Sequence, residues 1–319
     1  MGLRDLLRRK KGRQAIAVVV ATRNPAALAA LEKFSTAATM REAFTTEGVY
    51  SALSGAQLAV VDPEDLVEKG MSRQALLEVL QGNGVVWARG EEIAADPARF
   101  EQAALAAQGR VDALPPRAVA IANYSGGVGK TTLSLDLAVF VREKLGLPTC
   151  VVEVCYGTSA LRAMCDPNLP HLYEIFTQSV PPGRFRGVDI IAMEYDTAQM
   201  IFAREMELRE FLSKIKRDHV LTVFDCNHPH PIWHIVQSLS DRVIVPATTR
   251  PDCLANSRRL VSEIEGAVLV GNRVGTREKV LLQGVHRALD LPEVEAPERF
   301  TGELGRRLVP VVYPGWRES

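Results

Sequence analysis

The strongest chemical signal in this 319-residue sequence is a glycine-rich segment, residues 126–132, that ends in a lysine and two threonines. Glycines allow backbone N–H groups to turn inward around phosphate oxygens, because they adopt angles that other residues disfavour. Lys130 would reach the β- and γ-phosphates of a nucleotide, and the Thr131 hydroxyl would bind Mg²⁺. The segment therefore predicts a site for a nucleotide and magnesium.

Such a loop needs a strand before it and a helix after it, since the helix N-terminus adds a positive dipole end. The apolar run 118–122 predicts the strand, and residues 133–144 predict an amphipathic helix that ends before Gly146. The ordinary GxxxxGK[ST] pattern fails, because Tyr124 stands where its first glycine belongs. The deviant pattern GGxGK[ST] fits.

This loop and the segments after it resemble the MinD/ParA family of deviant Walker-A ATPases over about residues 117–310. Residues 221–229 match the family's switch II strand and loop, residues 241–246 its next strand, and residues 267–274 the strand that ends in an adenine-reading asparagine. Residues 296–299 correspond to the family's late adenine-side loop. The resemblance implies that Mg²⁺ is held by Thr131 and Asp225. It implies that ATP or ADP is bound by Gly126, Gly127, Val128, Gly129, Lys130, Thr131, Thr132 and Asn272.

Two departures from the family concern hydrolysis. The family's signature lysine should precede Gly126, and Ser125 stands there. Its Asp-x-Asp pair after the loop helix is replaced by Glu153 and Cys155. A cation and a carboxylate aimed at a phosphoryl transition state each contribute several kcal/mol, so hydrolysis should fall by several orders of magnitude. We expect ATP binding with slow or absent hydrolysis.

Residues 14–112 predict a smaller α/β domain that resembles a response-regulator receiver domain. Its expected strands are residues 15–21, 47–52, 57–62 and 84–87, and its expected helices are residues 25–34 and 72–81. The predicted fold class is thus α/β with two doubly wound domains, a receiver-like (flavodoxin-like) domain and a P-loop NTPase domain with a mostly parallel sheet.

Asp62 ends the third expected strand, where a receiver domain carries its phosphate acceptor. Receiver domains hold magnesium with an acidic pair after the first strand, and this chain has Thr22-Arg23-Asn24 there. Without those carboxylates, metal-dependent phosphorylation is poorly supported. We favour a domain used for docking or dimerisation, with phosphorylation of Asp62 as the alternative.

The domain boundary is predicted at residues 113–117, where two adjacent prolines favour a short, stiff linker, and the P-loop domain is predicted at residues 118–319. Residues 1–13 carry six Arg or Lys residues against one Asp, with leucines at helical spacing. The segment favours a solvated terminus, because three leucines bury little area; binding to an anionic membrane surface is the alternative.

Composition narrows the class of protein. With 38 basic and 38 acidic residues, the chain has no overall charge that would drive non-specific nucleic-acid binding. No apolar run is long enough to span a bilayer, no secretory signal is visible, and the five cysteines form no CxxC pair. We expect a cytoplasmic protein, peripheral on the inner membrane if residues 1–13 bind lipid.

Three further groups allow alternatives. His228, His230 and His234 favour a partner-contacting loop over a zinc site, because prolines interrupt their spacing. Cys155 and Cys226 are predicted to be small buried thiols rather than a functional pair. Five arginines favour solvated helix faces over a DNA-binding face: Arg250, Arg258, Arg259, Arg306 and Arg307.

The order of the two domains resembles TadZ/CpaE-type proteins, which localise pilus-assembly machinery at the bacterial inner membrane. The resemblance implies an ATP-binding positioning or scaffold protein, a homodimer, and protein partners in a localised assembly. The alternative is an active ParA-type partition ATPase that binds DNA non-specifically.

Overall fold

The structure is a computed structural model that describes residues 16–34, 36, 38–82, 85–107, 114–294 and 300–316. The chain divides into two compact units, Met1–Pro115 and Pro116–Ser319. The basic segment 1–13 and the predicted adenine-side loop 296–299 lie outside the described residues. Within the described ranges, no helix combines the length and apolar character needed to cross a membrane.

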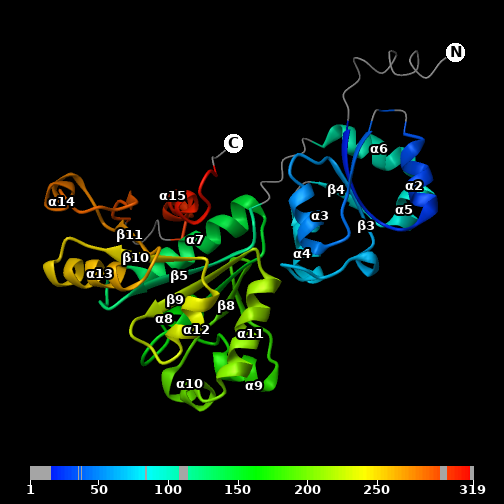
Figure 1. The fold of residues 1–319 in the computed structure, drawn as a ribbon. Helices are drawn as coiled ribbons and strands as arrows, with labels where there is room; N and C mark the ends of the chain where they lie inside the picture. Colours follow the sequence, from blue (N-terminus) through cyan, green and yellow to red (C-terminus); the bar gives the residue numbers. More distant parts are fainter. Residues whose placement is uncertain are drawn as a thin grey trace. The chain divides into compact units, whose positions relative to one another are not determined.

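The first unit is a parallel sheet with helices between its strands (Figure 1). In the described residues its strands run in the order β2-β1-β3-β4, an order that also occurs in the first four strands of flavodoxin-like sheets. The strands are β1 (Ile16–Ala21), β2 (Ala38–Glu42), β3 (Leu58–Val61) and β4 (Val86–Ala88). The helices are α2 (Pro25–Glu32), α3 (Thr46–Ala52), α4 (Arg73–Gly82), α5 (Gly90–Ala95) and α6 (Pro97–Ala106), with the 3₁₀ turn η1 (Pro63–Asp65).

The strand predicted at residues 47–52 is wrong, because this segment is helix α3. The side chain of Thr45 caps the helix by accepting a hydrogen bond from the Gly48 N–H at 3.0 Å. Val49 and Leu53, one helical turn apart, are both completely buried. The β-branched and aromatic side chains that favoured a strand locally are therefore buried on one face of a helix.

The second unit contains a larger, mostly parallel sheet. In the described residues its order is β12-β11-β10-β5-β9-β6-β8-β7, with β7 antiparallel to β8. The strands are β5 (Arg117–Asn123), β6 (Thr149–Val154), β7 (Gly183–Phe185), β8 (Val188–Ile191), β9 (Leu221–Asn227), β10 (Arg242–Ala247), β11 (Val268–Gly271) and β12 (Leu289–Asp290). The helices are α7 (Lys130–Leu145), α8 (Ala160–Met164), α9 (Leu172–Gln178), α10 (Tyr195–Phe202), α11 (Glu205–Asp218), α12 (Trp233–Leu239), α13 (Pro251–Glu263), α14 (Thr276–Leu281) and α15 (Glu303–Val312).

Helices cover both faces of this sheet. Figure 1 shows α7 and α15 on one side and α11 and α12 on the other. Central strands β5, β6 and β9 are paired in register, so that Ile121 faces Asp225 and Glu153 faces Asp225 across neighbouring ladders. The carboxyl ends of these three strands therefore meet at one edge of the sheet, where doubly wound folds bind ligands.

The amphipathic character predicted for the helix after the glycine loop is wrong. Every residue of α7 from Leu133 to Val141 is buried, because the sheet covers one side of the helix and α15 packs on another. A helix that is buried all round lacks the polar face of a surface helix. The end predicted before Gly146 is confirmed, since Gly146 caps α7 with a φ of 66°.

Candidate nucleotide-binding site

The loop between β5 and α7 has the backbone that its glycines predict. Gly127 and Gly129 have φ angles of 71° and 91°, which other residues rarely adopt. A Cβ built on Gly127 or Gly126 would meet nothing within 4 Å. The N-terminus of α7 begins at Lys130, so the free N–H groups of its first turn lie at the end of the loop. The loop is thus open on the side where a phosphate would bind.

Lys130 is buried at this loop, with 8% of its surface exposed. Its Nζ donates a hydrogen bond to the carbonyl of Ser125 at 3.0 Å. Burial lowers the pKa of Lys130, while the nearby Asp225 raises it. An ammonium group has three donors, so Lys130 keeps donors for an anion that would also compensate its desolvation.

Asp225 lies near the carboxyl end of β9, close enough to Lys130 to raise the pKa of that lysine, and is also buried. Burial raises its pKa to about 7, against the effects of a hydrogen bond from Thr131 and the charge of Lys130. Its Oδ1 atom has no hydrogen-bond partner among the described residues. A buried, unpartnered carboxylate oxygen beside a threonine hydroxyl fits a magnesium ion, because Mg²⁺ prefers oxygen ligands. Thr131 and Asp225 would hold the ion, which would neutralise phosphate charge.

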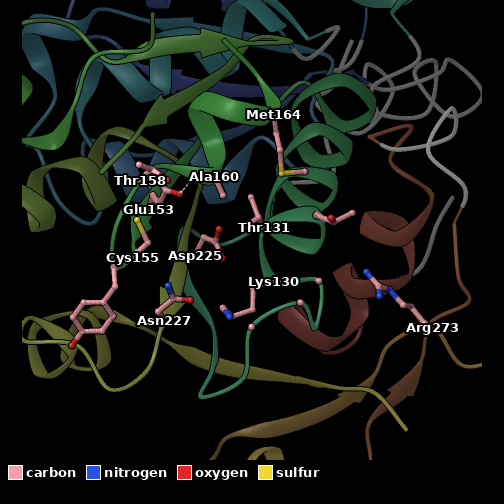
Figure 2. Close-up of a pocket in the computed structure, with 15 residues that line it drawn as sticks. Lys130, Thr131, Glu153, Cys155, Thr158, Ala160, Met164, Asp225, Asn227 and Arg273 are labelled. Carbon is pink, nitrogen blue, oxygen red and sulfur yellow. Dashed lines mark hydrogen bonds between the residues drawn. The ribbon is translucent and has the colours of Figure 1, made fainter. Parts of the chain in front are cut away.

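A cavity of about 380 Å³ lies over these residues. Figure 2 shows Asp225 and Thr131 near its centre, Glu153 and Cys155 on one side, and Arg273 on the other. The cavity includes every predicted loop residue except the buried Val128. Its lining is Gly126, Gly127, Gly129, Lys130, Thr131, Thr132, Glu153, Cys155, Tyr156, Thr158, Ala160, Met164, Asp225, Asn227 and Arg273.

Glu153 lines this cavity, but its carboxylate is used to hold the fold. It accepts hydrogen bonds from the N–H groups of Ala160 at 2.7 Å, Leu161 at 3.3 Å and Met193 at 3.0 Å. The Ser159 hydroxyl also donates to it. Glu153 thus caps the N-terminus of α8 and ties it to the end of β8. With these bonds made, little of its accepting capacity remains for a water molecule.

The two other departures also have partners inside the protein. Asn256 of α13 donates a hydrogen bond to the Ser125 hydroxyl at 3.1 Å. The Cys155 thiol donates to the Met193 carbonyl at 3.5 Å, and burial raises its pKa. A protonated thiol cannot act as the base or water-orienting acceptor that a carboxylate provides.

Asn272, just beyond β11, contacts the loop itself. Its Nδ2 donates to the Val128 carbonyl at 2.8 Å, and a Cβ on Gly129 would lie 2.3 Å from the same nitrogen. Asn272 lines a second cavity of about 60 Å³ with Arg273, Pro292 and other residues. The amide nitrogen of Asn272 therefore holds the loop, and its amide oxygen is the atom that could accept a hydrogen bond from an adenine base.

Arg273 is the functional candidate that the sequence did not reveal. It lines both the 380 Å³ and the 60 Å³ cavities, beside the loop but 141 positions or more after it in the sequence. The one available signal was its position directly after Asn272.

The histidines of the 228–234 segment point to different partners. Nε2 of His230 lies 3.2 Å from the Cys155 carbonyl, and burial lowers the pKa of His230 to about 4. His234 pairs with Glu205 at 2.9 Å. The described residues contain no group of three His, Cys, Asp or Glu side chains arranged to hold a metal ion.

The predicted buried thiols are confirmed, since Cys155 and Cys226 are both buried and unpaired. Four of the five arginines considered for a DNA-binding face form ion pairs with acidic residues close in sequence. These pairs are Arg250–Asp252, Arg259–Glu263, Arg306–Glu303 and Arg307–Glu303.

In the first unit, Asp62 follows β3 and is already engaged on both oxygens. Its Oδ1 accepts from the Gly90 N–H at 2.9 Å, and the Thr22 hydroxyl donates to its Oδ2. Arg23 and Asn24 supply no carboxylate; the Arg23 N–H binds Asp65 at 2.7 Å and Asn24 caps α2. Asp62 therefore links the ends of β1 and β3 to the start of α5.

Replacing Gly90 with alanine tests this structural role of Asp62. The new Cβ would lie 2.6 Å from Asp62 Oδ2 and 2.7 Å from Thr22 Oγ1, so the Gly90→Ala variant should lose about 1–3 kcal/mol of stability. Hydrogen exchange of β1 and β3 amides should accelerate accordingly. The control is Glu91→Ala, at an exposed neighbour on the same helix; equal exchange in the two variants would contradict the prediction.

Comparisons with known proteins give distant likenesses. No family model matches the chain. The uncharacterized protein MJECL24 of Methanocaldococcus jannaschii is 25% identical over 171 residues, which are 46% of this chain. The chain spans 64% of the length of that relative.

Similar solved structures include cobyrinic acid a,c-diamide synthase from Mycobacterium smegmatis with bound ADP and magnesium. It is 18% identical, with a TM-score of 0.49, over 63% of this chain and 99% of the other. The cell division ATPase MinD from Pyrococcus furiosus is 16% identical, with a TM-score of 0.47, over 61% and 92% of the two chains. The site is defined by its own geometry: a glycine loop, a buried ammonium and a buried carboxylate at the carboxyl edge of a parallel sheet.

Proposed function

We propose that this chain is an ATP-binding positioning or scaffold protein of the MinD/ParA class that hydrolyses ATP slowly or not at all. The observation that carries the proposal is that buried Lys130 lies near Asp225, whose buried Oδ1 has no hydrogen-bond partner among the described residues, at an open glycine loop. Burying an ammonium group and a carboxyl group is costly unless a ligand brings a phosphate to one and a metal ion to the other.

The loop amides and Lys130 would bind the β- and γ-phosphates, and Thr131 and Asp225 would hold Mg²⁺. When bound, the ion supplies charge neutralisation on the phosphate oxygens. Slow hydrolysis follows from the groups around the cavity. Ser125 brings no cation, Cys155 brings a neutral thiol, and Glu153 is committed to capping α8.

A scaffold role accords with a site that binds but does not turn over, since nucleotide occupancy then stabilises one state of the protein. The proposal includes a homodimer and protein partners in a localised assembly such as a pilus or secretion machine. It includes a receiver-like first unit that serves docking, because both oxygens of Asp62 are engaged in holding that unit together. Four of the five arginines considered for a DNA-binding face form ion pairs with nearby carboxylates, which does not favour DNA binding.

Thermal unfolding with and without Mg-ATP, paired with a phosphate-release assay, tests the proposal. At ATP concentrations about 100 times Kd, binding should stabilise the protein by about 2.7 kcal/mol, a rise in Tm of about 5–10 °C for a unit of this size. Phosphate release should stay near background. No Tm shift with any adenine nucleotide would refute nucleotide binding, and brisk, Lys130-dependent release would refute slow hydrolysis.

A further inference from the structure

Arg273 lies where two neighbouring cavities of the second unit meet. The larger cavity extends over Lys130 and Asp225, and the smaller one includes Asn272 and Pro292. The residues that line both are Gly129, Thr132 and Arg273. A ligand long enough to occupy both cavities must therefore pass between the start of α7 and Arg273.

The guanidinium of Arg273 is available to such a ligand. Arg273 is exposed, and within the described ranges no hydrogen bond or ion pair joins its side chain to another residue. Glu293 lines the smaller cavity as well, and no ion pair joins it to Arg273 there. Figure 2 shows the Arg273 side chain directed back across the cavity toward the α7 start, where Thr131 lies.

The backbone of Arg273 has a positive φ angle, which is uncommon for a residue other than glycine. Its φ is 58°, in the left-handed region that non-glycine residues rarely occupy. Strained conformations of this kind gather at ligand-binding sites, where surrounding structure holds them. The preceding residue, Asn272, is held by its hydrogen bond to the Val128 carbonyl of the glycine loop. Arg273 therefore directly follows a residue that is fixed to the loop.

We propose that Arg273 binds the α-phosphate of the nucleotide, as a second cation that acts beside Lys130. This rests on the proposed function, which places the β- and γ-phosphates at Lys130, and on the resemblance that assigns the adenine base to Asn272. The α-phosphate is the charged group between those two ends, and it falls where the cavities join. A guanidinium is suited to this position, because its planar array of donors matches phosphate oxygens.

The test compares affinities for ATP, ADP, AMP and adenosine, measured by displacement of a fluorescent ADP analogue. Arg273→Ala should weaken ATP, ADP and AMP alike, by about 10- to 100-fold, and leave adenosine unchanged. Lys130→Ala should weaken ATP and ADP but not AMP. Arg277→Ala is the matched control, since Arg277 is an exposed residue of α14 that lines neither cavity.

A second variant separates binding from stability. Arg273→Gly removes the guanidinium while glycine accepts the left-handed backbone without strain, so Tm should stay level or rise while phosphate-dependent affinity falls. Arg273→Lys should restore part of that affinity. Suppose that the intact protein binds the ADP analogue. The assignment is then wrong if Arg273→Gly binds each of the four ligands as tightly as the intact protein does, or if its affinity for adenosine falls as strongly as its affinity for ATP. If the intact protein binds no nucleotide, the proposed function itself fails.

Discussion

Replacing Lys130 with alanine should abolish the stabilisation by Mg-ATP and weaken ATP binding by at least about 100-fold. The ammonium is buried at the open side of the glycine loop and donates to the Ser125 carbonyl at 3.0 Å. Its removal deletes the cation nearest the phosphate positions, and charge-assisted bonds to phosphate are among the stronger polar contacts. Isothermal titration with Mg-ATP measures the loss.

The unfolding behaviour of the same variant distinguishes a binding role from a structural one. Burial lowers the pKa of Lys130, because removing the ammonium group from water disfavours its charged form. The ligand-free variant should therefore be at least as stable as the original protein. Lys144→Ala is the control, because Lys144 is an exposed lysine in the last turn of the same helix. Undiminished ATP affinity in Lys130→Ala would contradict the whole assignment of the loop.

Replacing Asp136 with alanine should destabilise the second unit by about 3–5 kcal/mol, even without nucleotide. Asp136 is buried on α7 and accepts hydrogen bonds from the Gly302 N–H at 2.9 Å and the Gly305 N–H at 2.8 Å. The Asp136 side chain on α7 thus caps the N-terminus of the neighbouring helix α15. The approach is close, since a Cβ on Gly305 would lie 2.3 Å from the Asp136 carbonyl oxygen. Alanine would leave both N–H groups buried without partners.

Urea unfolding followed by far-UV circular dichroism measures this effect. Asp136→Asn should fall between the original protein and Asp136→Ala, because its amide oxygen can accept from only one side while its NH₂ group faces the other donor. Asp196→Ala, at an exposed position in the first turn of α10, should change stability by less than about 0.5 kcal/mol. Equal unfolding midpoints for the two alanine variants would show that the α15 cap does not stabilise the fold.

The phosphate loop was predictable because its parts are contiguous in the sequence. The strand, the glycines with positive φ, Lys130 and the start of α7 lie within residues 117–145, so local backbone preferences fix their geometry. Asp225 was predicted from the resemblance of residues 221–229 to the family's switch II strand and loop. It lies in β9, which is a central buried strand of the parallel sheet.

The elements that were missed or misassigned carry weak or misleading local signals. β2 is mostly exposed and polar, and it is a strand because its backbone pairs with β1 from Ile16 opposite Ala38 onward. α3 has strand-favouring side chains but a threonine cap and a buried helical face. α7 lost its predicted polar face to the packing of α15, which follows it by more than 150 residues.

The sequence by itself determined that the chain has a glycine-rich turn between a strand and a helix, a lysine and a threonine at the start of that helix, and an aspartate in a later parallel strand. Only the tertiary structure decided what the neighbours of that loop do. It committed Glu153 to capping α8, bound Asn272 to the loop carbonyl, and placed Arg273 at the junction of two cavities. The reason is physical: backbone preferences act over a few residues, whereas burial and hydrogen bonding join residues that meet only after the sheet has assembled.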